Sequence, residues 1–341
     1  FRSTGDPEQE YEWAPPTVAF ERPVVAWLWP AYRAVAPTVD AVRDDREHGA
    51  AWLSVRACEV LRDRAAELAA GGAVEATEAA DGDGGTDAPG AVLALGRDLR
   101  TARPSMVAVG NRVDRVLADA TDPAAVVERA GEVLAAALAA DADAAERAAR
   151  ELDGAAHVLT LSRSGTVART LRALDPERVS VAESRPGAEG VGVAESLAED
   201  GRRVTLLADS AVAHAVTAVD AVLVGADTLL SDGRVVNKAG TRAALLAAAN
   251  DGVPAVVVAA RDKVSPTATT DLEPRPRVAV YDGDAPLDVL APTFDVSPAD
   301  VARVVTEDGT LDRDGVAALA RAARERARRV DTDGSERVDD G

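Results

Sequence analysis

The spacing of apolar residues changes along the chain at about residue 153. Over 23–152 the apolar residues recur every three or four positions, as Leu53 and Ala57 do, which is the spacing of helices with one buried face. Over 153–330, short apolar runs alternate with helical segments. This pattern predicts an α/β fold in which an N-terminal helical domain precedes a Rossmann-like domain, a doubly wound parallel sheet.

The short apolar runs of the second domain are expected to be strands. Each is four or five residues long and leads into a turn with polar residues or glycine, as strands buried on both faces of a parallel sheet do. The expected strands are 158–161, 179–182, 204–207, 221–224 and 255–259, with 278–281 as a sixth candidate.

The helical pattern predicts separate helices at 91–99 and 104–118. A longer helix is expected over 122–152, with Asp122 as its N-cap and Pro123 at its first position, where proline is well tolerated. A last helix is expected at 313–329.

Three segments have no apolar period. Residues 71–90 are acidic and rich in glycine and alanine, which predicts a flexible loop. Residues 331–341 are expected to form a disordered tail. Residues 1–22 are expected to be a linker or the remnant of an upstream domain.

Polar side chains gather between residues 220 and 263. The buried run 221–224 is followed by Asp227, and Asn237 and Lys238 precede Thr241, which is expected to cap a helix. Ligands bind at the carboxyl ends of parallel strands, and a helix N-terminus offers N–H groups to a phosphate. This stretch therefore predicts a phosphate site. The alternative is an ordinary strand, hairpin and helix with surface polar groups.

Composition favours the first interpretation. The net charge is −20 and the pI about 4.6, which disfavours direct binding of nucleic acid. Lysine occurs only at Lys238 and Lys263. Arginine and alanine are abundant, as in cytosolic proteins of extreme halophiles, although a G+C-rich genome has the same effect. Because lysine is so scarce, both lysines are candidates for function.

Several kinds of chemistry are not expected. Cys58 is the single cysteine, and the three histidines are scattered, so neither a disulfide nor a metal site is predicted. The Gly-x-Gly-x-x-Gly pattern of dinucleotide-binding folds is absent, and no cofactor is predicted. No apolar run has membrane-spanning length and no signal peptide is visible, so a cytoplasmic protein without a membrane partner is expected.

Polar residues follow the other expected strands as well. The first strand leads into a turn of hydroxyls and glycine that can cradle a phosphate; the second leads into a charged turn. The candidate ligand-binding residues of these turns are Ser162, Arg163, Ser164, Gly165, Arg185 and Glu189. From the helical domain, Arg103 offers a bidentate phosphate donor, and Gly49 lies at a loop-to-helix junction. For His48 beside it, a solvated helix residue and a ligand contact are equally open.

Four motifs in this order resemble one family. They are Glu183-Ser-Arg-Pro186, Gly225-Ala-Asp227, Asn237-Lys238-x-Gly240-Thr241, and Phe294-Asp-Val-Ser-Pro298 with Thr306-Glu-x-Gly309. They resemble the family that joins the α, β and δ subunits of translation initiation factor 2B to ribose-1,5-bisphosphate isomerase and methylthioribose-1-phosphate isomerase. The similarity covers 23–323. A short stretch in 1–22 also resembles the last strand of a Nudix domain, without the Nudix box.

The resemblance implies roles for individual residues. Asp227 matches the family aspartate that moves a proton on the sugar oxygen. Asn237 and Lys238 match the pair that holds substrate, and Arg103 matches the phosphate-binding arginine. Ser162 stands at the position of the catalytic cysteine.

Three positions depart from the isomerase pattern. His48 replaces an arginine before Gly49, Glu189 replaces a glutamine, and Ser162 replaces the cysteine. A hydroxyl is a much weaker acid than a thiol and needs an activating base, and no histidine lies near Ser162 in the sequence.

These departures lead to a regulatory interpretation. We predict an initiation-factor-2B-like protein that binds a phosphorylated pentose or an AMP-like nucleotide, with a role in regulation or translation. The first alternative is an active ribose-1,5-bisphosphate isomerase, an aldose–ketose isomerase, and the second is a scaffold without catalysis. The family resemblance implies a homodimer or larger homo-oligomer, with a translation initiation factor as a candidate partner.

Overall fold

The computed structural model describes residues 38–45, 48–78, 88–118 and 120–336. The chain divides into two compact units, 1–37 and 38–341, and every described residue belongs to the second. The predicted remnant 1–22 and the first part of the predicted helical domain lie outside the described residues. The predicted boundary at residue 152 falls inside the second unit, so that division stays a prediction.

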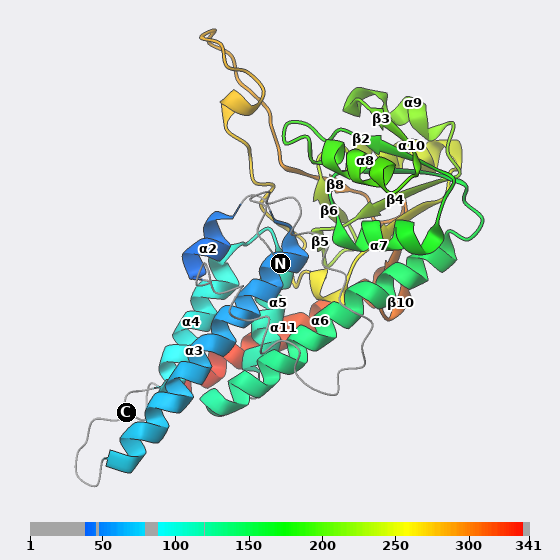
Figure 1. The fold of residues 1–341 in the computed structure, drawn as a ribbon. Coiled ribbons are helices and arrows are strands. Elements are labelled where there is room, and N and C mark those ends of the chain that lie inside the picture. Colours follow the sequence, from blue (N-terminus) through cyan, green and yellow to red (C-terminus); the bar gives the residue numbers. More distant parts are fainter. Residues whose placement is uncertain (1–37, 46–47, 79–87, 119, 337–341) are drawn as a thin grey trace. The chain divides into compact units, whose positions relative to one another are not determined.

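Helices make up the first half of the described chain (Figure 1). They are α2 (Val39–Asp44), α3 (Ala50–Glu78), α4 (Ala88–Ala102), α5 (Val107–Leu117) and α6 (Pro123–Glu151). The start of α6 is as predicted: the Asp122 carboxylate accepts a hydrogen bond from the Ala125 N–H at 2.9 Å, and Pro123 opens the first turn.

The flexible loop predicted at 71–90 was wrong at both ends. Helix α3 continues to Glu78 and α4 begins at Ala88, while 79–87 lie outside the described residues. Alanine and glutamate recur between residues 71 and 78, and both are strong helix formers. The high helix propensity of these two residue types outweighs the absence of a periodic apolar pattern in this segment.

The disordered tail predicted at 331–341 was also wrong where the structure describes it. Helix α11 (Arg313–Glu336) runs seven residues past the predicted end at 329. Arg100 Nη1 of α4 lies 2.6 Å from Asp331 Oδ1 and ties this part of α11 to the helices.

The second half is built on a mostly parallel sheet, as predicted, with seven strands that include β9 and β10, which the sequence did not predict. Its order is β10-β9-β7-β4-β1-β2-β3, and every neighbouring pair is parallel except β10 with β9. The strands are β1 (His157–Leu161), β2 (Arg178–Ala182), β3 (Arg203–Leu207), β4 (Ala221–Gly225), β7 (Ala255–Val258), β9 (Arg303–Thr306) and β10 (Gly309–Leu311). Five of the expected strands are confirmed.

Helices cover both faces of this sheet because alternate strand residues point to opposite cores. Leu159 packs in one core with α9 (Val212–Val216), α10 (Thr241–Asp251) and the first part of α11. Val158 packs in the other core with α6, α7 (Gly165–Leu174) and α8 (Glu189–Glu199). The doubly wound arrangement is therefore confirmed.

A small second sheet, which the apolar pattern did not predict, joins the helices to the large sheet. It consists of β5 (Thr228–Leu229), β6 (Val235–Lys238) and β8 (Phe294–Ser297), all antiparallel. Leu230, Val236 and Phe294 belong to the core of α3, α4 and α5. Strand β6 also carries Asn237 and Lys238, so this sheet places two predicted site residues against the helical part.

The sixth candidate strand, 278–281, was wrong. The segment forms a short 3-10 helix, η4 (Arg277–Ala279), in an arm that extends away from the sheet (Figure 1). Val278 is 61% exposed and Leu290 is 90% exposed. Four apolar residues form a strand only where a neighbouring strand accepts their hydrogen bonds, and none lies beside this segment within the described residues.

The charge of Asp114 on α5 opposes folding. This residue is 4% exposed, and burial raises the pKa of its carboxyl from 3.8 to about 6, although Arg100 counteracts the rise. Between these pH values only the folded state keeps the proton. Stability therefore falls as pH rises from 3.8 to about 6, by about 3 kcal/mol at most.

Asp114→Asn should flatten this fall in urea unfolding measured between pH 4 and 7. Glu128→Gln, which removes an exposed carboxyl from α6, should leave the fall unchanged. Parallel pH profiles for Asp114→Asn and wild type would show that the buried carboxyl keeps its ordinary pKa.

Candidate functional site

The order of the strands reverses between β1 and β4. From β1 the chain continues to β2 and β3 on one side, and later to β4, β7 and β9 on the other. Ligands of open α/β sheets bind at such a switch point, beyond the carboxyl ends of the strands. Ser162 follows β1, and Asp227 lies two residues beyond β4. The two turns pack closely, because a Cβ atom on Gly225 would lie 2.9 Å from Ser164 Oγ.

The Asp227 carboxyl lies among charges from several segments. Burial raises its pKa, and the neighbouring carboxylate of Glu273 adds to the rise. The positive charges of Lys263, Lys238 and Arg103 oppose it. A carboxyl whose pKa is raised above its ordinary value is easier to protonate, and such shifts are typical of groups that act in acid–base catalysis.

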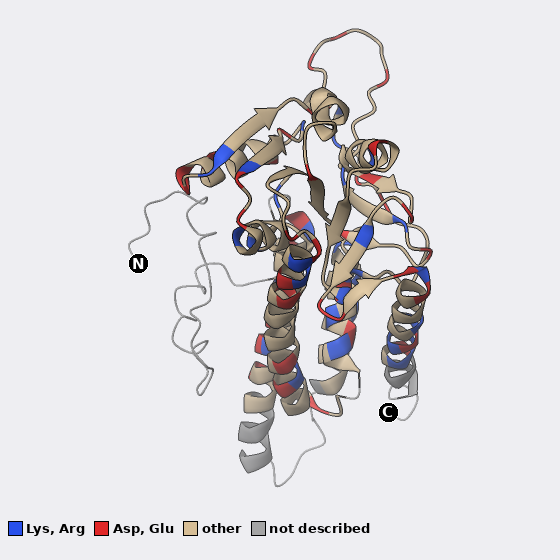
Figure 2. Cartoon of the chain, turned by 90° about the vertical axis from the view of Figure 1, so that its right-hand side faces the viewer, with Lys and Arg blue, Asp and Glu red and all other residues tan. Residues whose placement is uncertain are grey.

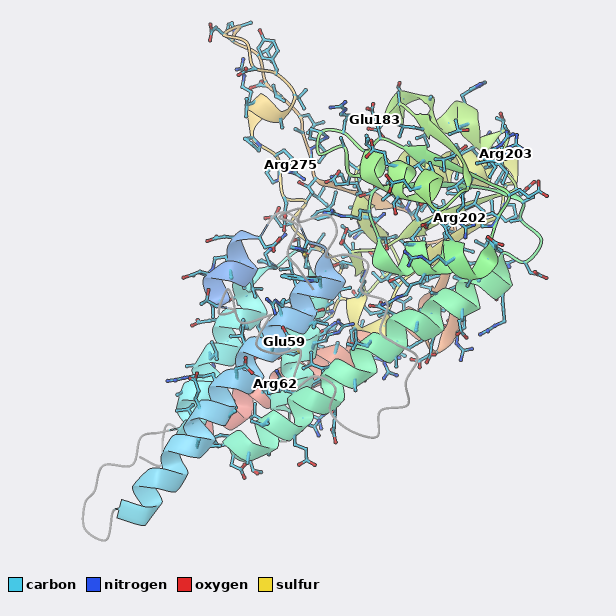
Figure 3. The ribbon with its side chains drawn as sticks, viewed as in Figure 1. Glu59, Arg62, Glu183, Arg202, Arg203 and Arg275 are labelled. Carbon is cyan, nitrogen blue, oxygen red and sulfur yellow. The ribbon has the colours of Figure 1, made fainter. Side chains whose placement is uncertain are left out.

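Lys238 and Glu189, both predicted site residues, form an ion pair. Lys238 Nζ lies 2.5 Å from Glu189 Oε1, and the Lys238 residue is 5% exposed. Arg275, at the base of the arm in Figure 3, approaches the same carboxylate oxygen at 3.6 Å. Glu189 Oε2 is buried without a hydrogen-bond partner among the described residues. An incoming anion must therefore compete with Glu189 for Lys238.

Arg103, the predicted phosphate donor, is likewise engaged by a carboxylate. Its Nη2 lies 3.1 Å from Glu273 Oε2, and its Nη1 donates to the carbonyl of Asp45. Ser105 Oγ donates to the Glu273 carboxylate. Arg103 is 3% exposed, so a phosphate can reach this guanidinium only if Glu273 moves away.

The predicted residue Gly49 lies at the exposed start of α3, in the same neighbourhood as Arg103. Asp45, whose carbonyl accepts from Arg103, also holds His48: its Oδ1 accepts from the His48 N–H at 2.8 Å, and its Oδ2 lies 2.6 Å from Nδ1. The His48 ring stacks on Trp52 with 3.8 Å between ring centroids. His48 is thus a half-buried residue that is held by Asp45 and Trp52.

The N-terminus of α10 is occupied by a side chain, contrary to the prediction of a free phosphate site there. Asp295 Oδ2 accepts hydrogen bonds from the Gly240 N–H at 2.8 Å and the Arg242 N–H at 3.1 Å. The expected N-cap, Thr241, is the first helical residue instead, and Gly240 is the N-cap at φ 107°. Asn237 Nδ2 donates to Thr241 Oγ1 at 2.9 Å, which orients the amide beside Lys238.

Ser162 sits in a strained turn without a base. Its φ is 58°, and its N–H donates to Ser184 Oγ at 2.7 Å. Its own hydroxyl has no hydrogen-bond partner among the described residues. His157 bonds Ser180 near the opposite ends of the strands, at 2.8 Å. The hydroxyl therefore has none of the activation that a nucleophile or a carbon base needs.

The other predicted residues of these turns lie nearer the surface. Ser164 caps α7 by accepting from the Val167 N–H at 3.4 Å, and Arg163 and Gly165 are exposed. Arg185 is exposed and lies 3.0 Å from Glu183 Oε2. The structure does not bring these residues into contact with Asp227 or Lys238.

Lys263 was a candidate in the sequence only because lysine is rare, and the structure places its side chain next to Asp227. Its Nζ donates to the Ala226 carbonyl at 2.6 Å, one residue before Asp227, and it is 6% exposed. Helix α5 fixes the turn that carries it: Asn111 Nδ2 donates to the Asp262 carbonyl at 2.7 Å, and Arg112 Nε lies 3.2 Å from Asp262 Oδ2.

Arg112→Met should lower the free energy of unfolding by about 3 kcal/mol, because it leaves the buried Asp262 with one fewer charge partner. Urea unfolding at pH 7 measures this loss. Arg150→Met removes an arginine that is exposed and forms only a 3.8 Å pair with Glu146, and should change stability by less than about 0.5 kcal/mol. Equal stability of the two variants would contradict the structural role of Arg112.

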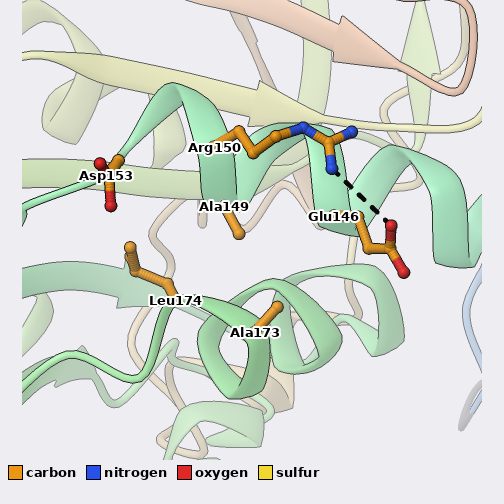
Figure 4. Close-up of a pocket in the computed structure, with 6 residues that line it drawn as sticks. All are labelled: Glu146, Ala149, Arg150, Asp153, Ala173 and Leu174. Atoms are coloured by element: carbon orange, nitrogen blue, oxygen red, sulfur yellow. Dashed lines mark ion pairs between the residues drawn. The ribbon is translucent and has the colours of Figure 1, made fainter.

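A hollow in the described part of the chain lies away from these residues. It has a volume of about 480 Å³ and lies between the ends of α6 and α7, lined by Glu146, Arg150 and Leu174 among others (Figure 4). Both helices end where their chains lead into the starts of β1 and β2, at the sheet edge opposite Asp227. This hollow therefore has no part in the candidate site.

The described residues offer neither a cluster of metal ligands nor a membrane-spanning helix. No group of three or more histidine, cysteine, aspartate or glutamate side chains there is placed to hold a metal ion. None of the helices described is both long and apolar enough to span a membrane.

Comparison with known proteins decides the family. The model of the initiation factor 2 subunit family matches residues 46–313. The chain belongs to this family. The match includes the helical part from α3 onward and the whole sheet, so the candidate site lies entirely within the region that defines the family.

Relatives in this family include sugar-phosphate isomerases. A ribose 1,5-bisphosphate isomerase of Haloferax volcanii is 32% identical over 312 residues, which are 86% of this chain and 92% of the relative. A probable bifunctional methylthioribose-1-phosphate isomerase/methylthioribulose-1-phosphate dehydratase of Nocardia farcinica is 35% identical over 82% of this chain and 59% of that protein.

A solved structure of the family has the same fold. The translation initiation factor eIF-2B of Pyrococcus horikoshii OT3 superposes with a TM-score of 0.67 at 25% identity, and covers 80% of this chain and 94% of its own. The initiation factor 2 subunit family thus contains proteins named as enzymes and proteins named as translation factors. The choice between these two functions for this chain therefore depends on the residues of its site.

Proposed function

We propose that this family member is a sugar-phosphate isomerase that converts ribose 1,5-bisphosphate to ribulose 1,5-bisphosphate. The observation that carries the proposal is the half-buried Asp227, whose carboxyl has a raised pKa and lies among the charges of Lys263, Lys238 and Arg103. The Haloferax volcanii relative supports this activity better than a regulatory role, because its similarity extends over 92% of its length.

The reaction moves protons between carbon and oxygen without any redox partner. The ring oxygen and carbon one each gain a proton, and carbon two and its hydroxyl each lose one. We propose that Asp227 performs these transfers in turn. As an acid it gives a proton to the ring oxygen while the bond from this oxygen to carbon one breaks, and as a base it then takes the proton from carbon two. After exchange with solvent the carboxyl returns a proton to carbon one and takes up the proton of the hydroxyl at carbon two, which becomes the ketone.

The surrounding cations have a separate role in this proposal. Negative charge develops on the oxygen at carbon two when its hydroxyl loses its proton and the ketone forms. Fixed ammonium groups in a site that excludes water stabilise such charge strongly. We assign this task to two lysines. Lys238 performs it once the substrate has displaced Glu189, and Lys263 performs it from its position on the Ala226 carbonyl, next to Asp227. Ser162, which lacks a base, is assigned to hydrogen bonding.

Turnover tests the proposal directly. The protein is incubated with ribose 1,5-bisphosphate, and product is followed by phosphorus NMR at several enzyme concentrations. We expect ribulose 1,5-bisphosphate to form at a rate proportional to enzyme. Methylthioribose 1-phosphate serves as the comparison substrate and should react more slowly, because it lacks the second phosphate.

A regulatory role is the second candidate, favoured by the unactivated hydroxyl of Ser162. It predicts that ribose 1,5-bisphosphate or AMP raises the melting temperature without any turnover. The same samples, examined by light scattering, test the predicted homodimer or larger assembly, and a translation initiation factor is the partner to try in this case.

A further inference from the structure

A second hollow, of about 300 Å³, lies between α5, α6 and α11. None of the predicted site residues lines it. Four of its lining residues are arginines: Arg115 from α5, Arg129 from α6, and Arg326 and Arg329 from α11. Figure 1 shows α11 running beside α5 and α6. Three helices that are distant in sequence therefore contribute cations to one small space.

The charge of this hollow is opposite to that of the chain. Basic and acidic side chains alternate along most of the helices (Figure 2), and the net charge is −20. The hollow nevertheless holds four guanidinium groups and one carboxylate, that of Glu132, which is exposed. An anion in this hollow would be attracted by the guanidinium groups that line it.

The pKa of the Arg326 guanidinium is lower than its ordinary value, as expected for a partly buried cation near other cations. Burial lowers the pKa of its guanidinium, and the neighbouring charges of Arg115 and Arg329 lower it further. Asp262 and Asp114 act in the opposite direction, yet the pKa stays below its ordinary value. Burial, the largest cause of the lowered pKa, thus outweighs the effect of the two carboxylates.

Two of the arginines are held in place before any ligand arrives. Arg115 Nη1 lies 2.8 Å from Asp262 Oδ1, and Arg129 Nη2 donates to the Arg115 carbonyl at 3.2 Å. Arg129 Nε is a buried donor without an acceptor among the described residues. A buried donor without a partner is unfavourable, and a bound oxyanion can supply the acceptor.

We propose that this arginine pocket is a second anion site, specific for a phosphate group. A guanidinium presents parallel N–H donors that match phosphate oxygens, and several guanidiniums together favour a dianion over chloride. The volume of about 300 Å³ leaves room for the phosphate and for part of the molecule that bears it. This site is independent of the proposed isomerase site.

Calorimetric titration with inorganic phosphate, at constant ionic strength in chloride buffer, tests the proposal. The full chain should bind phosphate at two classes of site. Arg326→Gln/Arg329→Gln should weaken one class about tenfold or more, and Lys238→Met should weaken only the other. Arg321→Gln/Arg328→Gln removes the same charge from α11 outside the pocket and should leave both classes unchanged.

A titration with ribose 5-phosphate separates free phosphate from an ester. Tighter binding of the ester at the class lost in Arg326→Gln/Arg329→Gln identifies a phosphomonoester site, and tighter binding of inorganic phosphate identifies a site for the free ion. Unchanged phosphate binding in a folded Arg326→Gln/Arg329→Gln variant would overturn the proposal.

Discussion

Asp227→Asn is expected to lower kcat/KM for ribose 1,5-bisphosphate by roughly 10³-fold, the range for loss of a general acid–base group. The amide has nearly the shape of the carboxyl but cannot exchange a proton. Initial rates at subsaturating substrate measure the effect. Asp232→Asn is the matched control, because Asp232 lies five residues further along, in the β5–β6 connection, and its 42% exposed side chain pairs with Arg234.

The stability of Asp227→Asn distinguishes a functional carboxyl from a structural one. Since burial and Glu273 raise the pKa of Asp227, its charge opposes folding at neutral pH, and the neutral amide should raise the melting temperature at pH 8. A variant that loses both activity and stability would indicate that Asp227 holds the fold together. A fully active Asp227→Asn would remove it from the mechanism.

Lys238→Met is expected to raise KM by tenfold to a hundredfold, because a charged hydrogen bond to the substrate is worth about 1.5–3 kcal/mol. The variant should also lower kcat, because Lys238 is assigned to the charge that develops on the oxygen at carbon two. Steady-state kinetics with ribose 1,5-bisphosphate separates the two parameters. An unchanged KM would mean that the ion pair between Lys238 and Glu189 persists throughout turnover and that Lys238 does not bind the substrate.

Glu189 provides the control for this result. Lys238→Met leaves the half-buried Glu189 carboxylate without its 2.5 Å partner, so the variant should also be destabilised. Adding Glu189→Gln should restore stability without restoring KM. Equal KM values for wild type and the double variant would show that the lysine acts only through the fold.

The strands of the large sheet could be predicted from the sequence, and those of the small sheet could not. Strands such as 221–224 are buried on both faces, so they appear as continuous apolar runs. Strand β6 mixes Val235 and Val236 with Asn237 and Lys238, and its partner β8 lies more than fifty residues away. Such a pair is recognisable only once the fold brings its strands together.

The candidate site, too, could be predicted only in part from the sequence. The motif around Asp227 predicted the strand end, but Lys263 and Glu273, which act on its carboxyl, come from a turn and a loop without any local pattern. The phosphate site predicted at Thr241 was wrong for a similar reason. Asp295 occupies that helix start from a strand fifty-five residues away, and side-chain caps of this range leave no signal in the sequence.

The most direct test of the account is proton exchange at carbon two. Ribose 1,5-bisphosphate is incubated with the full chain in deuterium oxide, and the carbon-two proton and the carbon-one positions of the product are followed by NMR. The account predicts that wild type forms ribulose 1,5-bisphosphate with solvent deuterium at carbon one, and that Asp227→Asn forms almost none. Absence of product with wild type, or equal deuterium incorporation by the variant, would contradict it.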